Sequence, residues 1–116
     1  NYFKAFNAND ENAYQIAHHF PHIRINDKAE VSIVMNASEL LPLKLIQNHL
    51  IRTENWDHSF LDSLELVHAS ANKVHFNIQF SRYKKEGLPY VTYKALWVVT
   101  QKEGRWGILA RSTYAP

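Results

Sequence analysis

The sequence contains no cysteine and only three glycines in 116 residues. Without cysteine, the chain can form neither disulfide bonds nor thiolate metal sites, and it has no thiol nucleophile. Three glycines cannot build a glycine-rich phosphate loop, a dinucleotide-binding fingerprint or a nucleophile elbow. The chemistry that remains depends on carboxylate, imidazole, hydroxyl and guanidinium groups.

Long apolar runs and a strong charge imbalance are also missing. No apolar run approaches the roughly 20 residues that a membrane span needs, and no signal-peptide pattern is present. The formal net charge is +2, with lysines and arginines scattered along the chain rather than gathered as in nucleic-acid-binding proteins. We therefore expect neither a membrane nor a nucleic acid among the partners. The lack of cysteine favours a cytoplasmic location, although the chain opens at Asn1 inside a predicted helix, which leaves open whether a leader precedes it.

Length and composition predict a single domain over residues 1–116. With 46% hydrophobic residues, the chain can form one core. A domain of this size buries about 65% of the surface that its unfolded chain exposes.

The first half of the chain predicts helices and short strands. Aromatic residues near the start indicate a first helix, and Asn9 followed by Asp10 begins a second, which we expect to run to Pro21. Strands are expected over 22–26 and 30–35. A third helix should run to about Arg52; since proline fits only the first helical turn, it begins near Leu41 or follows a separate turn at 36–39.

The second half predicts four long strands that form an antiparallel meander, over residues 57–69, 74–83, 91–100 and 105–114. The second of these strands alternates most cleanly. One of its faces is apolar and should contact the helices, with Val74, Phe76, Ile78 and Phe80. The other face is polar, with His75, Asn77, Gln79 and Ser81.

Three stretches carry a resemblance to a known superfamily: residues 20–25, residues 56–59, and the final hairpin with its Gly-Arg-Trp-Gly-Ile and Ala-Arg-Ser. They are similar to segments of the nuclear transport factor 2-like (SnoaL-like) superfamily. The resemblance implies an α+β, cystatin-like fold, in which a cone-shaped curved antiparallel sheet of about six strands wraps around three helices. The superfamily contains isomerases, dehydratases, cyclases and carriers, so the fold does not fix the reaction.

Residues near the expected mouth of the cone are the first candidates for ligand binding. His22 begins a strand there, and Arg24 follows on the same face; both point either into the cavity or into solvent. Trp56 is followed by Asp57 and His58. In superfamily enzymes, an Asp or an Asp-His pair acts as general base, which makes Asp57 and His58 candidate catalytic residues and Trp56 a candidate ligand contact. In the structural alternative, Asp57 ties down the loop and Trp56 fills the core.

Tyr93, Trp97 and Arg111 complete the predicted ligand contacts. Tyr93 and Trp97 share a strand face, and Arg111 lies across the last hairpin. Together they would form an aromatic wall beside a cation, suited to an anionic or carbonyl-bearing ligand. Alternatively, Trp97 lies in a subunit interface, and Arg111 forms an ion pair with an acid such as Asp62.

No metal and no cofactor are expected. His18 and His22 lie one helical turn apart in sequence, but Pro21 interrupts a helix between them and the glutamate of a zinc motif is missing.

Two classes of function follow from these observations. In the first, the cone binds a small apolar or carbonyl-bearing molecule, with cofactor-independent isomerase, dehydratase or cyclase activity as the class that the resemblance implies. In the second, the domain is a non-catalytic binding or protein-interaction module. In either case we expect a homodimer through the outer sheet face, because Leu96 and Val98 lie opposite Trp97 and helices cover only one side of the sheet.

Overall fold

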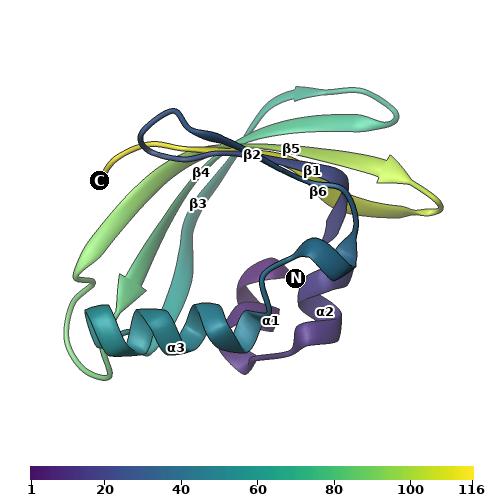
Figure 1. Cartoon of the computed structure of the whole chain (residues 1–116). Helices are drawn as coiled ribbons and strands as arrows, with labels where there is room; N and C mark the ends of the chain where they lie inside the picture. Colours follow the sequence, from purple (N-terminus) through teal and green to yellow (C-terminus); the bar gives the residue numbers. More distant parts are fainter.

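A computed structural model describes residues 1–116 as an α+β fold in which three helices lie against the concave side of a curved six-stranded sheet (Figure 1). The helices are α1 (Tyr2–Ala8), α2 (Glu11–Ile16) and α3 (Leu43–Glu54), with a 3₁₀ turn at Ala37–Glu39. The strands are β1 (His18–Ile25), β2 (Val31–Val34), β3 (His58–Ala69), β4 (Lys73–Tyr83), β5 (Val91–Lys102) and β6 (Arg105–Thr113). The predicted fold class is thereby confirmed.

The sheet has the strand order β2-β1-β6-β5-β4-β3. Strands β3 to β6 form the predicted antiparallel meander, and β1 and β2 form a hairpin. The hairpin joins the meander through a parallel pairing of β1 with β6. The first and last strands of the chain are therefore neighbours.

Each helix begins at a recognisable cap. The Asn1 side chain accepts a hydrogen bond from the backbone N–H of Lys4, and Asp10 does the same for Ala13. α3 follows Pro42, which has no side-chain group for capping. Its first N–H, that of Leu43, donates instead to the Glu11 carboxylate of α2 at 2.9 Å. Of the two alternatives left open for the start of this helix, the structure has the separate turn, at Ala37–Glu39. The cap of α3 comes from another helix.

The predicted end of the second helix is wrong. α2 ends at Ile16, and the segment that was expected to continue it to Pro21 forms β1 instead. The cause lies in the tertiary structure, since the Ala17 carbonyl accepts a hydrogen bond from the Ile108 N–H of β6 at 2.8 Å. Pairing with a distant strand outweighs the helical spacing of the local apolar residues.

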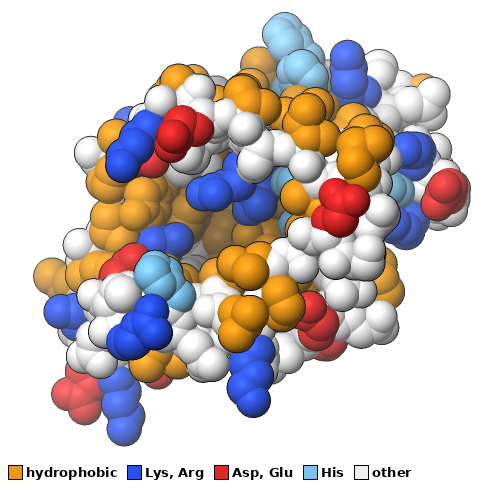
Figure 2. Space-filling model, viewed as in Figure 1, with side chains coloured by type: hydrophobic (Ala, Val, Ile, Leu, Met, Phe, Trp, Pro, Cys, Tyr) orange, Lys and Arg blue, Asp and Glu red, His pale blue; other side chains and the backbone are white.

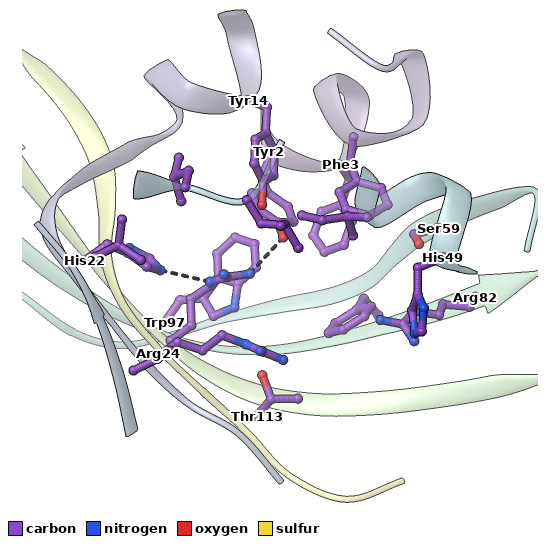
Figure 3. A pocket seen from close by; sticks show the side chains of 18 residues that line it. Tyr2, Phe3, Tyr14, His22, Arg24, His49, Ser59, Arg82, Trp97 and Thr113 are labelled. Atoms are coloured by element: carbon purple, nitrogen blue, oxygen red, sulfur yellow. Dashed lines mark hydrogen bonds between the residues drawn. The ribbon is translucent and has the colours of Figure 1, made fainter. Parts of the chain in front are cut away.

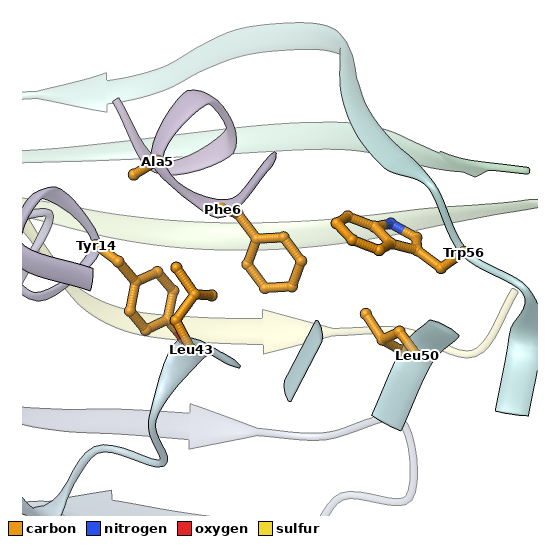
Figure 4. Close-up of a cluster of buried hydrophobic side chains, with 6 residues drawn as sticks. All are labelled: Ala5, Phe6, Tyr14, Leu43, Leu50 and Trp56. Carbon is orange, nitrogen blue, oxygen red and sulfur yellow. The ribbon is translucent and has the colours of Figure 1, made fainter. Parts of the chain in front are cut away.

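Two clusters of buried side chains fill the space between helices and sheet. One joins the three helices to the segment before β3 and contains Ala5, Phe6, Tyr14, Leu43, Leu50 and Trp56 (Figure 4). The other joins α1 to the sheet and contains Phe3, Ile78, Ala95, Trp97 and Ile108, with Phe76 and Phe80 packed against it. The apolar face predicted for β4 therefore does contact the helices.

α1 is fixed to the sheet by a pair of reciprocal hydrogen bonds. The Asn7 amide donates to the Ser59 carbonyl and accepts from the Ser59 N–H, both at 2.8 Å. None of the helices is both long and apolar enough to cross a membrane.

Ile78 and Leu64 provide a matched test of which part of the concave face is core. They are direct partners in the β3–β4 register and share a face, but Ile78 is 3% exposed and Leu64 55%. Ile78→Ala should lower the free energy of unfolding by about 2–5 kcal/mol, the range for truncating a buried aliphatic side chain. Leu64→Ala should cost less than about 1 kcal/mol. Urea unfolding measures both, and equal costs would contradict the assignment of the core.

Candidate functional site

The concave side of the sheet encloses a cavity of about 510 Å³, visible as a hollow in Figure 2. It lies between the sheet and the three helices, so every part of the fold contributes to its wall. The lining residues are Tyr2, Phe3, Phe6, Tyr14, His22, Arg24, Ser32, Val34, Leu40, Leu41, Ile46, His49, Ser59, Phe80, Arg82, Trp97, Arg111 and Thr113.

One wall of the cavity is aromatic. The Phe3 ring of α1 stacks on Trp97 of β5, with centroids 5.6 Å apart and ring planes within 8° of parallel. Phe80 of β4 contacts Phe3 at 5.5 Å, and Tyr2 meets the Trp97 ring edge-on at 5.2 Å. These rings hold one another in place, which gives a planar ligand a preformed surface to pack against.

The charged groups of the cavity are all basic. Arg24, Arg82 and Arg111 line it, and no Asp or Glu does; basic side chains are visible inside the hollow of Figure 2. Arg82 has a counter-ion just outside, because its Nη1 lies 3.2 Å from a Glu54 carboxylate oxygen. Arg24 and Arg111 have no carboxylate partner.

Arg111 is held by two uncharged groups (Figure 3). Its Nη1 donates to the Tyr2 hydroxyl at 2.8 Å, and its Nε donates to Nε2 of His22 at 3.2 Å. The other ring nitrogen of His22, Nδ1, lies 2.9 Å from the Ile108 carbonyl oxygen. His22 must therefore be neutral with its proton on Nδ1, since Nε2 accepts.

Burial, together with the charge of Arg111, lowers the pKa of His22 to about 4. His18 lies beside it, with ring centroids 4.8 Å apart. Burial and then Arg111 lower the pKa of His18 to about 3. Nδ1 of His18 donates to the Tyr14 carbonyl at 2.7 Å, while its buried Nε2 has no hydrogen-bond partner. Burial therefore keeps both imidazoles neutral, and the charge of Arg111 adds to the effect.

Two further groups at this end of the cavity have shifted pKa values. Burial and the neighbouring Tyr2 raise the pKa of the Tyr14 hydroxyl, so this group stays protonated. Burial and then the positive charge of Arg111 lower the pKa of Arg24. Charges at this end therefore act on one another through the cavity.

Three of the predicted site residues meet at the cavity, namely His22, Trp97 and Arg111. Arg24 also points inward, which settles the alternative left open for this pair of strand residues. Figure 3 labels His22, Arg24 and Trp97 among the lining side chains.

The other predicted residues lie outside the lining. Tyr93 is in contact with Arg82, because the Arg82 guanidinium carbon lies over the Tyr93 ring, 4.9 Å from its centroid. Trp56 is buried in the helical cluster and donates its indole N–H to Ser59 at 3.0 Å. Asp57 and His58 pair with each other at 2.9 Å, and His58 stacks on Tyr83 of the outer face. From this segment, Ser59 is the residue that reaches the cavity.

Sequence reasoning missed several lining residues. Arg82 continues the inward alternation of Phe80, so the strand pattern alone could have found it. His49 follows Ile46 by three residues on α3 and shares its face. Nothing in the sequence distinguishes Tyr2 and Tyr14 as cavity residues, because aromatic residues on short helices are equally typical of a hydrophobic core. No cluster of three or more His, Asp or Glu residues has the geometry of a metal site.

No protein-family model matches the chain, and no curated protein matches it in sequence. Solved structures do match. One is a nuclear transport factor 2-like protein from Cytophaga hutchinsonii, with 15% identity and a TM-score of 0.64 over 97% of this chain and 88% of that one. Another is a protein of unknown function with a cystatin-like fold from Nostoc punctiforme, with 10% identity and a TM-score of 0.73 over 99% of this chain and 83% of that one.

A third match is a nuclear transport factor 2-like protein with a cystatin-like fold from Novosphingobium aromaticivorans, with 8% identity and a TM-score of 0.73 over 97% of this chain and 73% of that one. At identities this low, the likeness shows the fold alone. The chain has the nuclear transport factor 2-like, cystatin-like fold that its final hairpin implied.

The buried histidines predict how stability depends on pH. His18 and His22 stay neutral in the folded protein down to pH values near 3 and 4, but titrate near 6.5 when unfolded. The unfolded state therefore binds more protons as the pH falls below about 6.5, and each group lowers stability by up to roughly 1.4 kcal/mol per pH unit until its folded pKa is reached.

Urea unfolding at several pH values between neutrality and 4 measures this slope. Removing one of the two titrating groups, as in His22→Gln, should make the slope shallower. If His22→Gln leaves the dependence of stability on pH unchanged, the pKa of His22 is not lowered in the folded protein.

Proposed function

We propose that the protein binds a small, ring-bearing molecule with a carbonyl or related polar group in the cone cavity. The observation that carries this proposal is the combination of about 510 Å³ of space with a stacked aromatic wall and convergent polar ends. A domain that used its cone only as a scaffold would fill it with side chains. Pockets that bind small molecules are largely apolar with a few placed polar groups, as this one is.

Binding is better supported than proton-transfer catalysis. A general base needs a carboxylate or imidazole that can accept a proton from the ligand. The cavity has no lining carboxylate, and the accepting nitrogen of His22 is already used by Arg111. Isomerase, dehydratase or cyclase activity would depend on His49, the other imidazole of the lining. Asp57 and His58 have no role in this proposal.

We also propose that the protein is a homodimer in the cytoplasm. The outer sheet face carries an apolar band across β2, β1, β6 and β5, in which Ile23 (36% exposed) pairs with Ile33 (58% exposed) on one side and with Ala110 of β6 on the other. Leu96 and Val98 of β5 extend the band, and Asn77 of β4 lies directly beside Leu96. Soluble monomers seldom expose so continuous an apolar surface, and a two-fold partner would cover it. The lack of cysteine fits a reducing compartment.

The tryptophans allow a direct test of cavity binding. Trp97 lines the cavity, whereas Trp106 lies on the exposed hairpin and is 48% exposed. In NMR titrations with 2-naphthamide or 2-naphthoate, the indole N–H signal of Trp97 should shift and that of Trp106 should not. Ile46→Phe, which narrows the cavity, should weaken the effect, while Leu45→Phe on the exposed side of α3 should not. No shift at Trp97 with either probe would refute cavity binding.

Light scattering tests the dimer. The protein should have twice the 13.6 kDa mass of one chain at micromolar concentration. Leu96→Glu places a charge in the apolar band and should give the monomer mass, because burying an unpaired carboxylate is costly. Leu64→Glu, on the opposite face, should remain dimeric. A monomer mass for the original protein would exclude the dimer, and a dimeric Leu96→Glu would place the interface elsewhere.

A further inference from the structure

Arg24 and Arg111 are direct partners in the parallel β1–β6 register, and both line the cavity. Two like charges in opposed positions of a sheet destabilise it. No negative charge on the cavity wall offsets this repulsion, since no lining residue is acidic and neither arginine forms an ion pair. The free protein therefore carries an uncompensated pair of positive charges inside a partly enclosed space.

Arg82 shows how this fold neutralises an arginine that has a structural role. Glu54 lies 3.2 Å from its guanidinium, and the Tyr90 hydroxyl donates to the same carboxylate at 2.7 Å. The charge of Arg82 is therefore offset in the free protein. A ligand anion would gain little binding free energy at Arg82, because Glu54 already offsets its charge. We therefore expect Arg24 and Arg111 to bind the negatively charged group of a ligand.

These two arginines also have hydrogen bonds left to give. A guanidinium has five N–H donors, and Arg111 uses one for His22 and one for Tyr2, which leaves three. The Arg24 side chain donates no hydrogen bond in the structure, and its register partner on β2 is Ser32, which lines the same cavity. A carboxylate has the flat, two-oxygen shape that a guanidinium binds with paired hydrogen bonds.

The aromatic wall of the cavity lies directly beside the two arginines. Trp97 is the direct partner of Arg111 in the β5–β6 register, and Phe3 stacks on its ring. A molecule that places its anionic end at the arginines therefore brings its next atoms onto the indole. Inorganic anions would leave this wall unused, which favours an organic acid.

We propose that the ligand is a planar, ring-bearing carboxylate whose carboxylate group lies between Arg24 and Arg111 and whose ring packs on Trp97. The proposal rests on the proposed function, because it names the chemical class of the molecule that enters the same cavity. It also explains why two cations are opposed there: the ligand supplies the missing negative charge.

The test compares two probes with the same ring, the anionic 2-naphthoate and the neutral 2-naphthamide of nearly the same shape, by equilibrium dialysis at neutral pH. The acid should bind at least about 10-fold more tightly than the amide, a factor within the worth of one charge-assisted hydrogen bond. Arg24→Gln and Arg111→Gln should each remove most of this preference. Arg82→Gln is the matched control, since it removes a cavity arginine that already has a counter-ion, and it should retain the preference.

Thermal unfolding gives a second test. If Arg24 only stabilised the fold, its replacement would lower the melting temperature, whereas the proposal predicts a rise. Without ligand, Arg24→Gln should raise the melting temperature by about 2–5 °C, because it removes the repulsion from Arg111. Excess 2-naphthoate should stabilise the original protein and not this variant. If Arg111→Gln does not fold, Arg24→Gln decides alone, since Arg24 makes no hydrogen bond that the substitution could break.

Four outcomes would overturn the proposal. Equal binding of acid and amide, or a preference that survives both Arg24→Gln and Arg111→Gln, would remove the carboxylate site and leave cavity binding standing. Displacement of 2-naphthoate by equimolar inorganic phosphate would show that the ring contributes nothing. Binding of neither probe would contradict the proposed function itself.

Discussion

The hydrogen bond from Arg111 to the neutral imidazole of His22 is the interaction on which the cationic end of the cavity depends. It joins the last strand to the first, and the bond from Arg111 to Tyr2 adds α1. Because both partners are uncharged, they orient the guanidinium without neutralising it. The Ile108 carbonyl fixes the proton of His22 on Nδ1, and this leaves Nε2 free to accept. A carboxylate in place of His22 or Tyr2 would form a stronger, charge-assisted hydrogen bond with Arg111, but it would also neutralise the positive charge of the guanidinium.

Much of the fold could be predicted from local pattern, because the strands of the meander alternate cleanly and the turns between them are distinct. The end of α2 could not, since the choice between helix and strand at His18 is made by β6, some ninety residues later in the chain. A local spacing of apolar residues carries no information about a partner at that distance. The cap of α3 by Glu11 escaped prediction for the same reason.

The candidate site divides in a similar way. His22, Trp97 and Arg111 were found because each sits at a definite place in an alternating strand. Asp57 and His58 were chosen for their chemistry, but the register puts His58 opposite Tyr83 on the outer face. Arg82 lies two residues beyond Phe80 on β4, so the alternation of the strand places its side chain on the cavity face, but a single cation at the end of an apolar row does not by itself indicate a binding site.

The parallel pairing of β1 with β6 also bears on the order in which the protein is made. A ribosome releases the N-terminal residues first, so the helices, β1 and the aromatic wall up to Trp97 emerge before β6. Arg111 belongs to β6, which follows all of these elements in the sequence, and β1 has no partner on that side until β6 arrives. Pairings between residues so far apart in sequence form slowly. The opposed arginines are therefore brought together after the aromatic wall has been made, and the cationic end of the cavity forms only once β6 has paired with β1.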